Sequence, residues 1–111
     1  MFKVKKNTIT ITQGDTLVTT VEIEQENGEP YVPDPEDRIR FALKSDYSDA
    51  QPLIIKQIDN DTLELRLEAT ETKTLQAREK PYVYDIQMTY ANGDVDTFID
   101  RAKFYVTEEV D

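Results

Sequence analysis

The sequence predicts a small all-β protein, an antiparallel β-sandwich of seven or eight strands, and three observations support this prediction. The three glycines of the 111-residue chain all lie in turn-forming pairs, which are Gly14-Asp15, Asn27-Gly28 and Asn92-Gly93. Asn-Gly favours a type I′ hairpin turn, because both residues tolerate positive φ. Runs of alternating apolar and polar residues flank the turns, and several short strands at turn spacing are typical of a sandwich.

The chain begins with two predicted strands, at residues 8–12 and 17–24, in which apolar residues recur at alternate positions. Between them, Gln13-Gly14-Asp15-Thr16 is expected to form a turn or a crossover between two sheets. Pro33 and Pro35 exclude a central strand in the next segment, because proline has no amide hydrogen for a sheet ladder.

The middle of the chain predicts three more strands. Residues 38–44 alternate clearly and carry a basic outer face, where we expect the charges to pair with acidic neighbouring strands. Residues 53–58 form a compact β-branched run, and residues 63–67 alternate leucine with charged residues. The basic side chains of the first of these strands are Arg38, Arg40 and Lys44.

One short helical turn is predicted near residues 70–76, because the alternation stops there. Thr70 has the character of an N-cap, and Glu71 places an acid in the first turn. Leu75 is the large apolar residue of this segment, so we expect the turn to plug one end of the sandwich.

The last third of the chain predicts a hairpin and a final strand. Residues 82–90 form the longest strand, and Asn92-Gly93 turns the chain into a return strand at about residues 95–99. Phe104 and Val106 then share one face of the last strand.

A helical turn followed by a tyrosine-bearing strand is typical of immunoglobulin-like sandwiches. In those folds a tyrosine at this place bonds back to the main chain as a tyrosine corner, and Tyr82 or Tyr84 fits that role. The alternative is that both are amphipathic aromatics at the edge of the core. The length and composition of the chain give no sign of a second domain, so residues 1–111 are expected to form a single β-sandwich domain.

Composition restricts the function. The net charge is −10, from 13 basic and 23 acidic residues, and such a field repels nucleic acid and anionic lipid surfaces. The N-terminus is followed by polar alternation, so no signal peptide or membrane span is predicted.

Histidine and cysteine are absent, which removes the common catalytic triads and thiolate metal sites. Ser45 and Ser48 lie in a polar loop without a recognisable catalytic motif, and the sequence therefore favours a protein that is not an enzyme.

Cofactors are not predicted. Oxygen-rich loops are candidates for Ca²⁺, but they lack the glycine and terminal glutamate of an EF-hand loop, and turn chemistry or solvation accounts for them. These loops are Asp59-Asn60-Asp61, Asp34-Pro35-Glu36-Asp37, and the segment with Asp46 and Asp49.

Exposed aromatic residues are the remaining candidates for a binding site, since aromatics are favoured at interfaces. Periodicity places most of the tyrosines and phenylalanines in the core. The exceptions expected near the surface are Tyr31, Tyr47 and Tyr105.

An ordered set of short motifs spans nearly the whole chain. It includes Gln13-Gly14-Asp15-Thr16 near the start, Tyr82-Val83-Tyr84-Asp85-Ile86-Gln87 in the longest strand, and Thr107-Glu108-Glu109-Val110 at the end. In this order the motifs resemble the small acidic proteins encoded in tail and structural-gene regions of prophages of Gram-positive bacteria. More loosely, they resemble the immunoglobulin-like N-terminal domain of phage baseplate upper proteins. Such proteins commonly carry arginine where this chain has Gln13, so no role of that arginine transfers.

The resemblance implies a non-enzymatic structural or accessory module of a phage tail or baseplate, which binds other phage structural proteins. It implies synthesis in the host cytoplasm, followed by incorporation into the virion. An exposed edge strand, either the first strand with its lysines or the last, is expected to add to a partner's sheet. Alone, the domain is expected to be a monomer or a weak homo-oligomer. The alternative is a module that binds a polysaccharide or a receptor on the host surface through Tyr31 or Tyr47.

Overall fold

A computed structural model of the chain describes residues 3–4, 8–24, 27–46, 48 and 51–108, with residues 3–4 and 98–101 described by their backbone alone. Strands make up most of this structure, and one helical turn interrupts them. In chain order the elements are β1 (Lys3–Val4), β2 (Ile9–Thr12), β3 (Leu17–Thr20), β4 (Ile23–Glu24), β5 (Arg38–Lys44), β6 (Ile54–Ile58), β7 (Glu64–Leu67), α1 (Ala69–Thr72), β8 (Arg78–Thr89) and β9 (Val95–Thr107).

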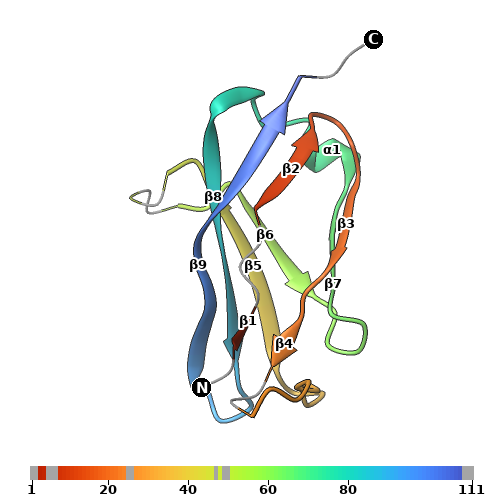
Figure 1. Cartoon of the computed structure of the whole chain (residues 1–111), viewed down its shortest axis with the longest axis vertical. Helices are drawn as coiled ribbons and strands as arrows, with labels where there is room; N and C mark the ends of the chain where they lie inside the picture. The colour runs from red at the N-terminus through yellow and green to blue at the C-terminus, as the bar shows by residue number, and fades with distance from the viewer. Residues whose placement is uncertain (1–2, 5–7, 25–26, 47, 49–50, 109–111) are drawn as a thin grey trace.

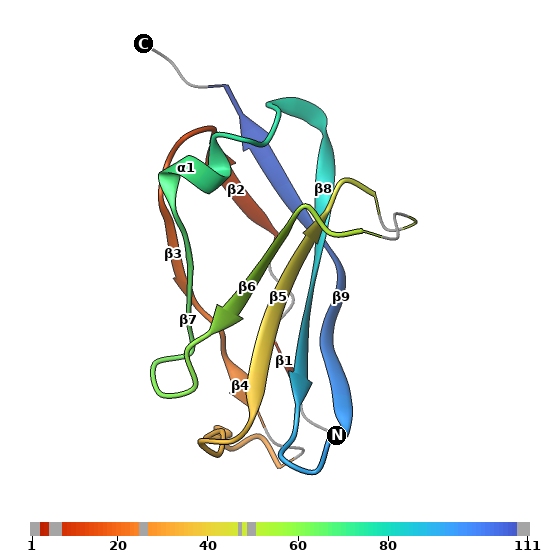
Figure 2. The same ribbon diagram turned by 180° about the vertical axis from the view of Figure 1, so that it is seen from behind.

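The strands form one five-stranded sheet, in the order β2-β9-β8-β5-β6, and two small sheets, β3-β7 and β1-β4 (Figures 1 and 2). Inward side chains of the large sheet and of β7 belong to a single apolar core, in which Phe41, Phe104 and Leu67 are fully buried. The predicted all-β, sandwich-like fold is therefore confirmed.

The large sheet is mixed rather than purely antiparallel. β2 pairs in parallel with the end of β9, from Ile9 opposite Phe104 to Thr12 opposite Thr107. The chain then leaves this sheet at Gly14, whose φ is 85°, and enters the opposite sheet as β3. The corner around Gly14 is thus a crossover between sheets, one of the two roles predicted for it.

Several strand boundaries differ from the predicted ones. The run at residues 17–24 divides into β3 and β4. The amide of Val21 still bonds to the carbonyl of Leu63, in the register of β3 with β7, and Ile23 then pairs with β1 instead. Leu63 itself has a φ of 56° and ends a turn, so β7 begins one residue later. The return strand and the last strand are one continuous element, β9, which β-bulges adapt to β8.

The helical turn lies slightly earlier than residues 70–76. α1 begins at Ala69, and its N-cap is Glu68 rather than Thr70. The amide of Glu68 donates to Oε1 of Glu71 at 3.0 Å, which is the acidic half of a capping box. Leu75, only 2% exposed, plugs this end of the core as predicted.

Tyr82 forms the tyrosine corner. Its hydroxyl accepts the amide of Gln76 at 2.8 Å and donates to the carbonyl of the same residue at 3.3 Å. Immunoglobulin domains place a disulfide cysteine two residues after this tyrosine, and here that position holds Tyr84. Its ring lies 5.4 Å from that of Phe41 and 6.4 Å from that of Phe104, so an aromatic cluster occupies the centre of the core.

In the part of the chain that the structure describes, no helix has the length and apolar character needed to cross a membrane.

Candidate functional site

Tyr31 is tied into the loop that precedes β5. It lies half-buried against the core, and its hydroxyl donates to Oδ2 of Asp37 at 2.8 Å. The amide of Asp34 donates to the same oxygen, and Asp37 is itself only 3% exposed. Burial, together with the Asp37 carboxylate, raises the pKa of Tyr31 to about 12. The Tyr31 hydroxyl therefore serves the fold of this loop, and only part of the ring faces solvent.

Tyr90 repeats this arrangement at the turn between β8 and β9. Its hydroxyl donates to Oδ2 of Asp96 at 2.8 Å. Burial and the nearby carboxylate raise the pKa of Tyr90 well above its ordinary value. Sequence analysis missed this pair, although both residues stand beside the Asn92-Gly93 turn that it identified.

Two of the predicted acidic loops lie side by side. The Asn60 side chain donates to the main-chain carbonyls of Asp34 and Asp37. Asp59 accepts the amides of Asp61 and Thr62, which lowers the pKa of its carboxyl. Within the described residues, no three acidic side chains are arranged to hold a metal ion. The Asp59 carboxylate therefore stabilises its own turn, and the Asp37 carboxylate accepts the Tyr31 hydroxyl and the Asp34 amide.

Asp46 lies in the loop after β5, where it accepts the ammonium of Lys80 at 2.8 Å. This hydrogen bond, with the amide of Ser48, lowers the pKa of the Asp46 carboxyl. Tyr47 and Asp49, the other candidates in this loop, lie outside the described residues.

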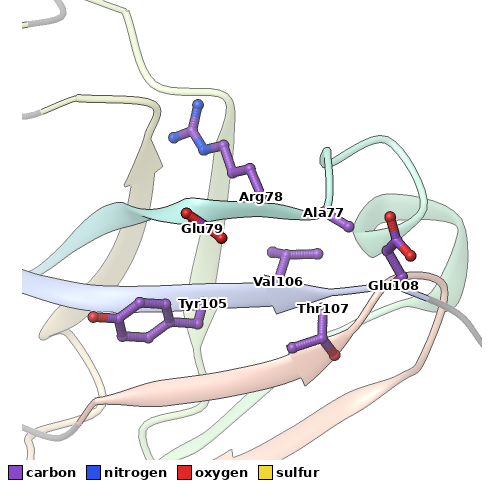
Figure 3. A pocket seen from close by; sticks show the side chains of 7 residues that line it. All are labelled: Ala77, Arg78, Glu79, Tyr105, Val106, Thr107 and Glu108. Carbon is purple, nitrogen blue, oxygen red and sulfur yellow. The ribbon is translucent and has the colours of Figure 1, made fainter.

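Tyr105 borders a surface hollow of about 570 Å³ between the start of β8 and the end of β9 (Figure 3). Arg78 also lines the hollow, but its guanidinium extends away from Tyr105 and bonds to Ser45 at 2.8 and 3.1 Å. It also stacks on the ring of Tyr82, 3.7 Å from the ring centre. The Arg78 guanidinium is therefore held by contacts within the fold, and Glu79, Tyr105 and Glu108 are the large polar side chains left to face a ligand.

The outer face of the large sheet gathers basic side chains. Because side chains alternate along a strand, the exposed residues of β5 share this face with Lys103 of β9 and Ile55 of β6. We call this surface the basic face, and its charged members are Arg38, Arg40, Lys44, Lys103, Asp85 and Glu79.

The residues directly opposite the basic side chains of β5 are uncharged, and the acidic residue of β8 at this level, Asp85, stands opposite Ala42. Arg38 lies opposite Thr89, and Lys44 lies opposite Val83. Arg40 lies between Gln57 and Gln87, and its Nη2 donates to Oε1 of Gln87 at 2.8 Å. A neutral amide orders the guanidinium without cancelling its charge. Among the described side chains the face therefore keeps four basic residues beside Asp85 and, at the end next to Tyr105, Glu79.

The basic face also carries apolar surface at its edge. Ile55 is 51% exposed and stands opposite Ala42, while Leu53, just before β6, is 55% exposed. Sequence analysis identified Arg38, Arg40 and Lys44 but missed Lys103 and Ile55. Only the strand order brings these two residues to the same face.

The edges of the large sheet are β2 and β6, so of the two expected edge strands the one at residues 8–12 is an edge, and the last strand is covered by β2 at its end. β9 lies between β8 and β2 at residues 104–107. β6 contains Lys56, whose ammonium meets Oε1 of Glu71 at 2.8 Å, and an edge lysine discourages pairing with another chain. The sheet face therefore offers a better docking surface than the β6 edge.

No protein-family model matches the chain, and no curated protein is significantly similar to it.

Proposed function

We propose that this domain is a non-enzymatic module of a phage tail or baseplate, which binds other structural proteins through its basic face. The observation that carries the proposal is the concentration of four basic side chains and exposed Ile55 on one sheet face of a chain with a net charge of −10. Apolar surface beside charged residues is a common composition for protein interfaces. The order of motifs along the chain supplies the phage context.

The basic face predicts the character of the partner. A protein surface rich in aspartate and glutamate meets complementary charge there, and it is repelled by the rest of the domain. The charges therefore orient the complex, and Ile55 and Leu53 add apolar contact at one side.

The test measures binding to the products of the neighbouring structural genes by calorimetry. Lys103→Glu should weaken binding about tenfold, because it places a repulsive charge at the interface. Lys73→Glu makes the same charge change beside α1, away from the basic face, and should leave binding unchanged. Equal effects of the two variants would reject the basic face, and neighbouring genes without tail, capsid or lysis functions would reject the phage assignment.

The hollow beside Tyr105 supports a second candidate function, binding of a host-surface polysaccharide. A half-buried tyrosine next to Glu79 and Thr107 combines a stacking surface with hydrogen-bonding groups. Binding on a glycan array that Tyr105→Ala abolishes would favour this function. Absence of glycan binding, together with tight binding to a tail protein, would exclude it.

A further inference from the structure

The face opposite the basic face is acidic. The outward side chains of β3, β4 and β7 alternate with the inward residues Val21, Ile23, Leu65 and Leu67 of the core. We call this outer surface the acidic face, and its charged members are Glu22, Glu24, Glu64, Arg66 and Glu68. Among the residues whose side chains the structure describes, it carries four acidic and one basic, and the strand register places Lys3 of β1 opposite Glu24.

Arg66 does little to neutralise the acidic face. Its Nε bonds to Oε1 of Glu68 at 2.7 Å, and Glu64 lies on the same strand. Glu22 and Glu24 are exposed at the end of the face near β1. An exposed aliphatic residue, Val18, lies opposite Arg66 and is 50% exposed.

The two faces point in opposite directions. Their inward side chains meet in one core cluster, so the outward side chains of the two layers face away from each other. Among the described side chains, the basic face has four basic residues with Asp85 and Glu79, and the acidic face has four acidic residues with Arg66. Each face also has at least one half-exposed aliphatic side chain. The surface of one copy is thus complementary to the opposite surface of another.

We propose that the basic face of one copy of this chain binds the acidic face of a second copy, in a head-to-tail arrangement. Two basic faces repel each other, as do two acidic faces, so a symmetric dimer through either face is disfavoured. A head-to-tail contact leaves one basic and one acidic face unused, and repetition produces a ring or a filament. This inference deepens the proposed function, because it names an occupant for the same basic face.

The net charge of the chain opposes this contact, and the dependence of association on salt therefore tests it. Two chains of charge −10 repel at long range, whereas the complementary faces attract at contact. Salt screens both terms, with a Debye length of about 8 Å at physiological ionic strength. If the faces dominate, added salt weakens association; if net repulsion dominates, added salt strengthens it.

The first experiment measures the average molar mass of the full chain by light scattering, at increasing concentration in 50 and in 500 mM NaCl. The proposal predicts that the mass rises with concentration at low salt, and that this rise is smaller at high salt. A constant monomer mass, or association that salt strengthens, would overturn it.

Charge reversal separates the two faces. Lys44→Glu with Lys103→Glu reverses part of the basic face, and Glu22→Lys with Glu24→Lys reverses part of the acidic face. Each double variant alone should associate about tenfold more weakly than the unaltered chain, because exposed ion pairs contribute modestly. An equimolar mixture should regain association, because the intact acidic face of the first variant meets the intact basic face of the second. A mixture that associates no better than its components would contradict the head-to-tail arrangement.

Lys73→Glu with Lys80→Glu is the matched control, since it makes the same charge change away from both faces. It should keep the association of the unaltered chain, and equal thermal midpoints check that all variants fold. The binding measurement with neighbouring gene products distinguishes the two proposals. Partner binding that K103E weakens, without self-association, would retain the proposed function and reject the second copy as occupant.

Discussion

At the end of the sandwich that contains α1, the Tyr82 hydroxyl bonds to main-chain groups of Gln76. At the other end of β8, the hydroxyls of Tyr31 and Tyr90 donate to the carboxylates of Asp37 and Asp96. Both ends thus use tyrosine to join a loop to the core. The tyrosine hydroxyl bonds to uncharged main-chain groups at the α1 end, which we call the neutral end, and to carboxylates at the other, which we call the carboxylate end. Removing one such hydrogen bond should therefore lower the free energy of unfolding by different amounts at the two ends, and with a different dependence on pH.

The largest effect is expected from Asp37→Ala at the carboxylate end. Asp37 is 3% exposed and accepts both the Tyr31 hydroxyl and the Asp34 amide, so the substitution removes a buried carboxylate that accepts two hydrogen bonds. We expect the free energy of unfolding in urea to fall by about 3 kcal/mol. Asp61→Ala, in an exposed turn, should change it by less than about 0.5 kcal/mol. A similar loss in both variants would show that Asp37 has no special role.

A smaller loss is expected from Tyr82→Phe at the neutral end. The ring stays in the core, and the Gln76 amide loses its acceptor, which should cost about 1.5 kcal/mol. Because no charged group takes part, the loss should be equal at pH 6 and pH 9. Tyr105→Phe is the control and should be nearly neutral. A strongly pH-dependent loss in Tyr82→Phe would remove the distinction between the two ends.

Alkaline pH should affect the carboxylate end selectively. The folded state raises the pKa of Tyr31 from 10.0 to about 12, so between these values the folded chain retains a proton that the unfolded chain releases. The stability that the Tyr31 hydroxyl contributes is therefore fully present below pH 10 and is lost as pH rises toward 12. Thermal midpoints measured from pH 8 to 12 should fall less steeply in Tyr31→Phe than in the unaltered chain. Parallel curves for the two proteins would contradict this role of Tyr31.

The smallest effect concerns the ion pair at the neutral end, between Lys56 and Glu71. Burial alone raises the pKa of Glu71, but the hydrogen bonds from Lys56 and from the Glu68 amide outweigh it and lower the pKa. The pair's contribution is therefore present at neutral pH and is lost as pH falls through the lowered pKa. Lys56→Met should cost about 0.5 kcal/mol in urea unfolding at pH 7, and less in acid. A loss that grows in acid would be inconsistent with this pair.

Alternation along the chain predicted much of the core. Ile39, Phe41 and Leu43, placed together on one face of the third clear strand, are all completely buried. Tyr82 was one of two candidates for the tyrosine corner, because the helical turn before it limits which strand can supply that residue. Burial is a local consequence of strand geometry, so the sequence reveals it.

The alternation along the chain does not reveal which distant strands pair with each other. The alternation of residues 8–12 is the same whether that strand pairs in parallel or antiparallel, so its parallel pairing with β9 could not be predicted. Lys103 and Ile55 join the basic face for the same reason, through strand order. Asp37 was assigned to a solvated acidic loop, and only the approach of Tyr31 and Asn60 explains its burial.

The parallel pairing of β2 with β9 has a mechanical consequence. β2 begins opposite Phe104, and β9 ends opposite Thr12, so tension applied through the two ends of the chain pulls these strands along each other in opposite directions. The ladder and the bond from the Gln13 amide to the Thr107 carbonyl then bear the load together, instead of opening one after another. Forced unfolding depends on the barrier to breaking such a set. The domain should therefore resist extension through the pairing of β2 with its last strand, β9.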